Sequence, residues 1–267
     1  MTVALLGAGV MGEALLAGIL QGRPASDLLV GEKRPERAAE LTERYGVEVV
    51  GNAEAVRRAG TVLLVVKPHD VGPLLDDVAA EARPGQLFVS LAAGITTAFV
   101  EARLPDGVAV VRVMPNTPAL VGEGMAAISP GTHSGDEQLR EAEELLRSTG
   151  RVTRVPESQQ DAVTAVSGSG PAYVFYVAES MIEGGVHLGL TRATATELVV
   201  QTLAGSAALL RDSGEHPTVL RERVTSPGGT TAAALRQLED GKVRADFLAA
   251  LEAARDRSRA LSSGEPA

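Results

Sequence analysis

The 267-residue chain contains no cysteine and no tryptophan. Without cysteine it can form no disulfide, thiolate zinc site, iron–sulfur cluster or thiol nucleophile. The four histidines are too scattered for metal-ligand spacing: His69, His133, His187 and His216. We therefore predict no metal site. The lack of cysteine also permits a reducing compartment, and we expect a cytoplasmic protein.

Aromatic side chains and basic charge are also scarce, at 3% aromatic residues and a formal net charge of −9. Stacking on single-stranded nucleic acid needs aromatics and phosphate binding needs basic surface, so nucleic acid is not an expected partner. The apolar stretch 3–20 lacks a basic leader and contains Glu13, which argues against a signal peptide. No apolar run approaches the roughly 20 residues of a membrane span, so we expect no membrane partner.

Residues 2 to about 160 alternate short β-branched or leucine-rich runs with amphipathic segments, as βαβ units do. The expected strands are Thr2–Leu6, Leu28–Val30, Glu48–Val50, Thr61–Val66, Leu87–Ser90, Ala109–Met114, Met125–Ile128 and Val152–Val155. The expected helices between them include Val10–Leu20, Pro35–Tyr45, Val71–Ala82 and Asp136–Ser148. This pattern predicts the α/β class, with an N-terminal Rossmann-type doubly wound sheet.

Strand-like runs vanish beyond about residue 165, where the segment Ser167–Pro171 marks the change. The expected helices are Pro171–His187, Ala193–Asp212, Thr230–Glu239 and Ala245–Leu261. We predict a dinucleotide-binding domain at 1–160, an all-helical substrate and dimerisation domain at 161–261, and a disordered tail at 262–267. Small residues such as Ala204, Gly205, Ala207 and Ala208 allow close helix contact, either between subunits or within one chain.

A glycine motif follows the first expected strand and opens a helix, with Gly7, Gly9 and Gly12 in the GxGxxG spacing. Gly7 allows the tight turn, Gly9 lets backbone approach a pyrophosphate, and Gly12 lets the helix sit close to the strand. The helix N-terminus favours an anion. Because strand, turn, helix and a later acidic residue all fall in place, we predict a dinucleotide site.

The residues after the second strand give conflicting signals about the cofactor. Glu32, 20 residues after Gly12, could accept hydrogen bonds from a ribose 2′-hydroxyl, which favours NAD. The adjacent Lys33 and Arg34 could hold a 2′-phosphate, which favours NADP. The orientation of Glu32 decides between them, and we favour NADP with NAD as the alternative.

The sequence offers few proton donors for ketone reduction. Its only lysines are Lys33, Lys67 and Lys242, and no tyrosine of the helical half is followed by a lysine four residues on. The second domain also lacks the first-turn lysine of β-hydroxyacid dehydrogenases. Alcohol chemistry is therefore disfavoured.

The segment 224–231, Val-Thr-Ser-Pro-Gly-Gly-Thr-Thr, combines two glycines, four hydroxyls and a helix start. Backbone N–H groups in such a segment can cradle a carboxylate. The simpler interpretation is a helix cap supplied by Thr230 or Thr231. Four hydroxyls exceed what a cap needs, which favours a ligand site.

Six motifs occur in the order and spacing of pyrroline-5-carboxylate reductases, a family that the chain resembles over nearly its whole length. They are Gly7–Gly12, Val66-Lys67-Pro68-His69, Leu91–Gly94, Arg112–Pro118, Ala165–Tyr173 and Thr225–Thr231. The last two are specific to the family, whereas the first is shared by many dinucleotide-binding proteins.

The resemblance implies NAD(P)H-dependent hydride transfer to the C=N bond of 1-pyrroline-5-carboxylate, the last step of proline biosynthesis. It also implies an interleaved homodimer, and in many members a decamer. The implied cofactor residues, beside the glycines and residues 32–34, are Val10, Met11, Asn52, Val66, Lys67, Pro68, Ala92, Ala93, Gly94 and Asn116. The implied substrate residues are Ser226, Gly228, Gly229, Thr230 and Thr231.

Within this set, Thr231 is expected to bond the ring nitrogen, and Ser226 with the N–H groups of Gly229 and Thr230 to bind the carboxylate. Thr231 and Ser226 are the candidate catalytic residues. Lys67 could instead be a solvated cation at a strand end, and Asn116 part of a rigid turn between two prolines. His69 is expected to be a turn residue. His216 could face a shared cleft if subunits exchange their helical domains.

Two other functions are consistent with the residues. One is a related imine reductase or β-hydroxyacid-type dehydrogenase acting on another small acid. The other is a non-catalytic NAD(P)-binding sensor or dimeric scaffold, against which the intact segment 226–231 argues.

Overall fold

The computed structural model describes residues 2–263 and divides into two compact units. Of the described residues, the first unit comprises 2–169 together with 254–263, and the second 170–253. The predicted boundary near residue 160 thus lies earlier than the observed one. The difference arises because α7 (Gln160–Val163) and the π-helical turn Thr164–Gly168 belong to the first unit. Gln160 attaches α7 to the sheet of this unit, since its Nε2 donates a hydrogen bond to the carbonyl oxygen of Ala127.

The first unit is built on an eight-stranded sheet in the order β3-β2-β1-β4-β5-β6-β7-β8. Adjacent strands are parallel except for β6 and β7, which are antiparallel. The strands are β1 (Val3–Leu6), β2 (Leu28–Gly31), β3 (Glu48–Val50), β4 (Thr61–Leu64), β5 (Leu87–Ser90), β6 (Ala109–Met114), β7 (Gly124–Pro130) and β8 (Gly150–Arg154). All eight predicted strands are present, and the doubly wound α/β fold is confirmed.

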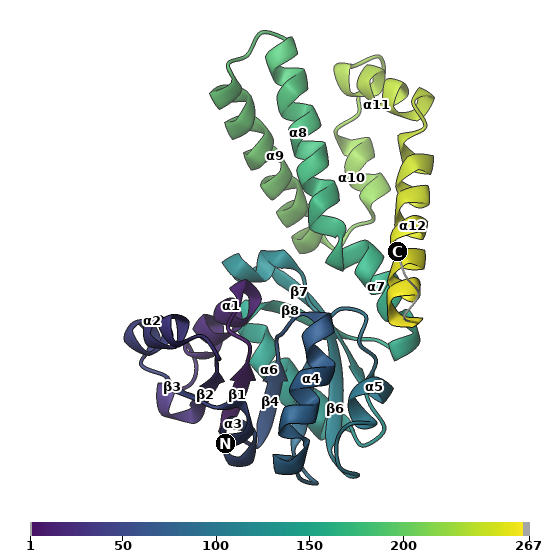
Figure 1. Cartoon of the computed structure of the whole chain (residues 1–267). Coiled ribbons are helices and arrows are strands. Elements are labelled where there is room, and N and C mark those ends of the chain that lie inside the picture. Colours follow the sequence, from purple (N-terminus) through teal and green to yellow (C-terminus); the bar gives the residue numbers. More distant parts are fainter. Residues whose placement is uncertain (1, 264–267) are drawn as a thin grey trace. The chain divides into compact units, whose positions relative to one another are not determined.

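Helices cover both faces of this sheet, as Figure 1 shows for α4 and α5 in front of the strands. The helices are α1 (Val10–Ile19), α2 (Pro35–Tyr45), α3 (Asn52–Arg58), α4 (Pro68–Val78), α5 (Thr97–Glu101) and α6 (Asp136–Leu146). Alternate side chains of each strand supply two cores, so that Leu5 packs with α1, α2 and α6 while Leu6 packs with α3, α4 and α5. Both faces are buried, which explains the continuous apolar runs of the strands.

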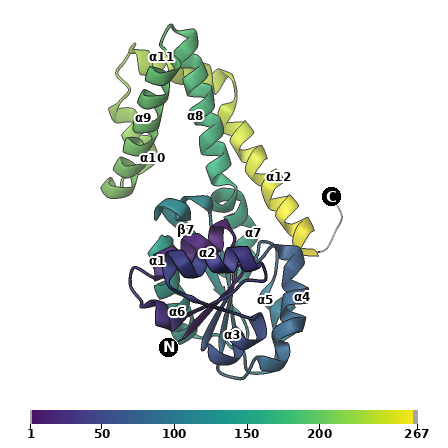
Figure 2. The same cartoon turned by 60° about the vertical axis from the view of Figure 1, so that its left-hand side comes forward.

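The second unit is entirely helical. It contains α8 (Gly170–His187), α9 (Arg192–Ser213), α10 (Pro217–Arg223), α11 (Thr230–Asp240) and the beginning of α12 (Val243–Ser263). Helices α8 and α9 lie side by side in both Figure 1 and Figure 2. Ser262 and Ser263 form the end of α12, so the predicted tail is shorter by these two residues, and 264–267 lie outside the described part of the chain.

Helix α9 differs from the expectation that no segment of the chain is long and apolar enough to span a membrane. Among the described residues it is the one helix long and apolar enough to cross a bilayer. Only 11% of its most apolar 18-residue stretch is buried in the structure. The sequence estimate counted unbroken apolar runs, whereas the alanines, leucines and valines of α9 are interrupted by polar residues such as Gln201. Helices that pack against protein share this composition, so it does not by itself indicate a membrane.

Candidate functional site

The predicted cofactor residues of the first unit all follow the carboxyl ends of its six parallel strands β1 to β6. Backbone hydrogen bonds tie three of these connections to neighbouring strands: Gly7 N to Gly31 O at 3.1 Å, Val65 N to Leu6 O at 2.9 Å and Leu91 N to Leu64 O at 3.0 Å. The sheet order reverses direction between β1 and β4, and ligands of such sheets bind outside the carboxyl ends at this point. The structure therefore gathers these residues at one edge.

The glycine-rich turn has the geometry expected from its spacing. Gly7 has φ +99°, and a Cβ there would lie 2.7 Å from Val66 Cγ1. A Cβ on Gly12 would overlap the carbonyl oxygen of Gly7, whereas one on Gly9 would meet no atom within 4 Å. Gly7 and Gly12 thus allow close packing, and Gly9 leaves open space where a ligand could approach.

Helix α1 presents its first backbone N–H groups beside this open space. Its N-cap is Gly9, and the first bond of the helical ladder runs from Glu13 N to Gly9 O at 2.8 Å. The N–H groups of Val10, Met11 and Gly12 precede that ladder and can bind a phosphate. Val10 is 73% exposed, so the N-terminus of α1 is accessible from solvent.

Glu32 is engaged by Arg34 rather than free to contact a ribose. Its Oε1 accepts from Arg34 N at 2.9 Å and Arg34 Nε at 3.0 Å, and its Oε2 accepts from Arg34 Nη2 at 3.0 Å. The Glu32 side chain is 7% exposed and that of Arg34 is 67% exposed. The Arg34 hydrogen bonds hold the pKa of the Glu32 carboxyl below its usual range. Lys33 pairs with Asp77 at 3.2 Å on the surface.

The remaining cofactor candidates divide into exposed groups and groups held by the protein. Lys67, Pro68 and His69 are exposed at the start of α4, and Asn52 begins α3 with its side-chain oxygen against Gly31. Ala92 is buried, Ala93 is exposed and Gly94 has φ +75°.

Asn116 serves as a brace between segments of the first unit. Its Nδ2 donates to Ser167 Oγ at 3.2 Å and to the Ser167 carbonyl at 3.3 Å, while its Oδ1 accepts from Met125 N at 2.8 Å. The side-chain amide is therefore committed to internal bonds, as expected of a rigid turn. Contact with the cofactor stays a prediction for this residue.

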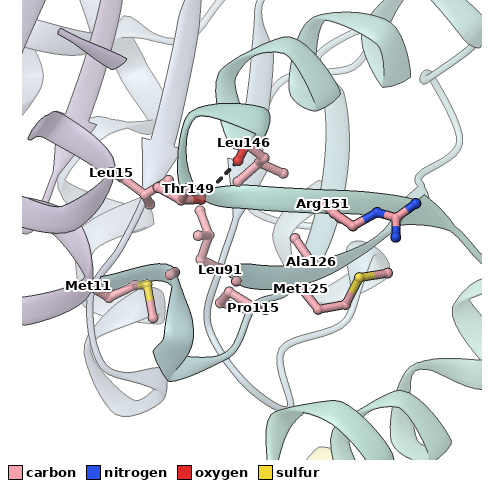
Figure 3. Close-up of a pocket in the computed structure, with 11 residues that line it drawn as sticks. Met11, Leu15, Leu91, Pro115, Met125, Ala126, Leu146, Thr149 and Arg151 are labelled. Carbon is pink, nitrogen blue, oxygen red and sulfur yellow. Dashed lines mark hydrogen bonds between the residues drawn. The ribbon is translucent and has the colours of Figure 1, made fainter. Parts of the chain in front are cut away.

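A small apolar cavity lies beside the start of α1 (Figure 3). Its lining includes Met11, Leu91, Pro115 and Met125, and its volume is about 10 Å³. This is room for a single water-sized molecule, so the cavity is a packing feature and not the cofactor site. It shows that Met11 and Leu91, from separate motifs, line a common space.

In the second unit, the segment 224–229 connects α10 to α11. Gly228 has φ +67°, and Gly229 N donates to Ser226 O at 3.0 Å. The N–H of Gly229 is thus used within the turn, and its expected role as a carboxylate donor stays a prediction. The ladder of α11 begins with Ala233 N bonding Gly229 O at 3.1 Å, so the N–H groups of Thr230, Thr231 and Ala232 precede it.

The threonines of this segment are not helix caps. The N-cap of α11 is Gly229, which has no side chain and makes no side-chain cap bond. Ser226 lies exposed with its hydroxyl over Gly229, and Thr231 is half-buried in the first turn. The simpler interpretation of Thr230 and Thr231 as caps is therefore wrong. His216 caps α10 instead, accepting from Thr218 N at Nδ1 over 3.3 Å.

One cluster around the glycine turn was missed from the sequence. Glu13 of α1 accepts from Tyr45 Oη and Arg44 Nη1, each at 2.8 Å, and also pairs with Arg37. Arg37 Nε further donates to the carbonyl oxygen of Ala8 at 3.4 Å. The cluster joins α2 to α1 and to the turn. The i,i+7 spacing of Arg37 and Arg44 on one face of α2 is the signal that could have found it.

Among residues 2–263, no group of three or more histidine, aspartate or glutamate side chains is arranged to hold a metal ion.

Comparisons with known proteins place this geometry in a family. Residues 157–261 match the model for pyrroline-5-carboxylate reductase dimerisation, and residues 2–94 match the model described as NADP oxidoreductase coenzyme F420-dependent. The pyrroline-5-carboxylate reductase of Mycobacterium tuberculosis (strain H37Rv) is 46% identical, covering 97% of this chain and 96% of its own. That of Pseudomonas aeruginosa is 41% identical, covering 97% and 96%.

Solved structures agree. A pyrroline-5-carboxylate reductase from Coxiella burnetii superposes with a TM-score of 0.93 at 34% identity, covering 98% of each chain. The pyrroline carboxylate reductase of Plasmodium falciparum, solved with NADP bound, has a TM-score of 0.87 at 29% identity and covers 98% of each chain.

The Glu13 cluster gives a prediction about stability. Hydrogen bonds from Arg37 and Tyr45, with the charge of Arg44, hold the pKa of Glu13 below its usual range. A carboxyl with a lowered folded pKa stabilises the fold above its unfolded pKa of about 4.3 and loses that contribution as pH falls through the folded value. Glu13→Gln should therefore cost about 1–2 kcal/mol of unfolding free energy at pH 7, and the cost should shrink below about pH 4.

Urea unfolding followed by circular dichroism at pH 7 and pH 3.5 checks this. Glu43→Gln, an exposed carboxylate of α2, is the matched control and should change stability by less than about 0.5 kcal/mol. Equal losses for the two variants at pH 7 would contradict the assigned role.

Proposed function

The chain belongs to the pyrroline-5-carboxylate reductases, and from that premise we propose that it reduces 1-pyrroline-5-carboxylate to proline with NADPH, using the carboxyl edge of the sheet and the segment 226–231. The observation that carries the site assignment is the set of uncommitted N–H groups at the starts of α1 and α11. Each can bind an anion, a pyrophosphate in one unit and a carboxylate in the other. Cytoplasmic location is part of the proposal, since reduced nicotinamide and amino-acid precursors are available there.

The reaction needs little acid chemistry from the protein. The cofactor supplies a hydride to the carbon of the C=N bond, and the ring nitrogen takes a proton to become a secondary amine. A protonated cyclic imine already accepts hydride readily, so the protein must hold its carboxylate and orient its nitrogen. The absence of a catalytic cysteine or first-turn lysine is consistent with this chemistry.

The substrate carboxylate is assigned to the start of α11. The N–H groups of Thr230, Thr231 and Ala232 precede the helical ladder, and the helix dipole favours a negative charge there. The exposed hydroxyl of Ser226 adds a donor on the same turn. Ala232 joins Gly229 and Thr230 among the proposed donors, and the hydroxyl of Thr231 is assigned to the ring nitrogen.

NADP is the proposed cofactor because Arg34 forms a hydrogen-bonded ion pair with Glu32. Both oxygens of Glu32 accept from Arg34, which balances the negative charge that would repel a 2′-phosphate. The pair leaves the exposed guanidinium of Arg34, with Lys33 beside it, where a 2′-phosphate would lie. The NADP-bound Plasmodium falciparum relative supports the same choice.

A homodimer is proposed because the second unit has almost no core of its own. Of residues 170–253, only two hydrophobic side chains are buried, those of Ala195 and Val199. Large apolar side chains of α8 and α9 are instead exposed: Val174, Phe175, Tyr176, Met181, Leu198, Val200, Leu209 and Leu210. An apolar hollow of about 370 Å³ lies among α10, α11 and α12, lined by residues such as Leu235 and Phe247. A second copy would bury these surfaces.

The Thr231→Ala variant tests the catalytic assignment. Removing the hydroxyl should lower kcat/KM for 1-pyrroline-5-carboxylate by about 100-fold while the Kd for NADPH stays within about twofold. Thr231→Ser should recover most of the activity, and Thr153→Ala on the exposed strand β8 is the matched control. Steady-state kinetics and fluorescence titration measure both quantities. Wild-type activity of Thr231→Ala would refute the assignment.

The Arg34→Ala variant tests cofactor choice. It removes the cation and frees Glu32, so the ratio of kcat/KM for NADPH to that for NADH should fall at least about tenfold. Arg57→Ala removes the same charge from another surface arginine, which pairs with Glu81, and should leave the ratio unchanged. An unchanged ratio in Arg34→Ala would show that the 2′-phosphate is read elsewhere.

The Phe175→Asp variant tests self-association. The wild type should have at least twice the mass of the 27.6 kDa chain, and a decamer would show ten times that mass. A carboxylate at this 66% exposed side chain should shift the protein toward monomer, because burying an unpaired charge is costly. Val121→Asp, at a 78% exposed apolar residue of the first unit, is the control. Light scattering after size exclusion measures the masses, and a monomeric wild type would overturn the proposal.

A further inference from the structure

The last turns of α12 return to the first unit and are anchored there. Residues from Ala254 onward belong to this unit, although α12 begins in the other. Ser258 is 6% exposed and its Oγ donates to Asp161 Oδ1 at 2.7 Å, while Arg259 Nε lies 3.9 Å from Asp161 Oδ2. A buried hydroxyl bonded to a carboxylate fixes this end of the helix on α7.

The same helix end lies against the connection between β5 and α5. A Cβ on Gly94 would lie 3.7 Å from Ser262 Oγ and 3.8 Å from Leu261 Cβ. On the inner side of this connection, Leu91 and Ala92 are buried in the two cores of the sheet. The segment 91–94 thus packs into the two sheet cores through Leu91 and Ala92, and the end of α12 lies at a distance from Gly94 that a single methyl group would bridge.

The segment 91–94 has little of its own to hold its conformation. Its side chains, Leu-Ala-Ala-Gly, include no hydrogen-bonding group. The turn is closed by a bond from Ile95 N to Ala92 O at 3.4 Å, which is long for an N–H···O bond. Gly94 has φ +75°, a conformation that glycine adopts without cost. Apart from this bond and the one from Leu91 N to Leu64 O at 3.0 Å, packing defines the turn, and the end of α12 is the neighbour of Gly94.

We propose that the last turns of α12, through Leu261 and Ser262, position the segment 91–94 to receive the nicotinamide end of the cofactor, with Ser258 as the anchor. The inference rests on the proposed function: with the 2′-phosphate at Arg34 after β2 and the pyrophosphate at the start of α1, the nicotinamide end extends over the connections after β4 and β5, which include the segment 91–94. These are positioning residues, because they act through the segment and not on the reacting atoms.

Two ligands separate this role from general stabilisation. NADPH includes the nicotinamide, whereas 2′-phospho-ADP-ribose lacks it and would use only the glycine turn and Arg34. Deletion of residues 259–267 removes Arg259, Leu261 and Ser262, and deletion of 264–267 is the matched control. We expect the longer deletion to raise the Kd of NADPH about tenfold and to change that of 2′-phospho-ADP-ribose by less than about twofold. The control deletion should change neither.

A pair of point variants decides the question if the longer deletion fails to fold. Ser258→Ala removes the bond to Asp161 and should weaken NADPH selectively, and Ser258→Thr keeps a hydroxyl and should restore binding. Equal weakening of both ligands, or no weakening of either, would overturn the inference. A wild type that fails to bind NADPH would instead contradict the proposed function, so the two failures are distinguishable.

Discussion

The close packing of α1 against the end of β1 is the constraint on which the nucleotide-binding half depends. It exists because neither Gly7 nor Gly12 has a Cβ: one at Gly7 would approach Val66 and one at Gly12 would overlap the Gly7 carbonyl. This contact directs the first N–H groups of α1 toward the edge where the other connections meet. The Glu13 cluster then ties α2 to the same turn, so the phosphate-binding geometry is supported from the strand and from the neighbouring helix.

The two units satisfy the hydrophobic effect in different ways. The sheet of the first unit has a buried core on each face and is complete within one chain. The helices of the second unit leave their large apolar side chains exposed and bury very little. The proposed dimer would stabilise such a unit and accounts for the coexistence of small residues and exposed leucines on α9. The membrane-like composition of this helix has the same explanation.

Much of the first unit could be predicted because each buried strand is a short apolar run between turn signals. The short helices α3 and α5 were missed, since seven and five residues give no clear helical period. The orientation of Glu32 was also beyond sequence reasoning, because a side chain two residues later, Arg34, determines it. The return of α12 to the first unit depends on Ser258 and Asp161, which are 97 positions apart and match no motif.

In the proposed substrate segment 226–231, too, the sequence predicted the ligand site but not which backbone N–H groups are available. Its glycines and hydroxyls marked it as a ligand site, and Gly228 does adopt positive φ. Which N–H groups remain available depends on the turn, where Gly229 bonds back to Ser226. Only the coordinates could therefore show that the N–H of Ala232 precedes the helical ladder beside those of Thr230 and Thr231.

The chain is proposed to reduce a cyclic imino acid with NADPH, with one helix start, that of α1, binding the pyrophosphate and another, that of α11, binding the substrate carboxylate. The most direct measurement is the amount of proline formed per NADPH oxidised when the wild-type protein is given 1-pyrroline-5-carboxylate. We expect one proline per NADPH oxidised, with catalytic turnover. Binding of NADPH without any proline formed would contradict it and would favour a cofactor-binding protein without catalysis.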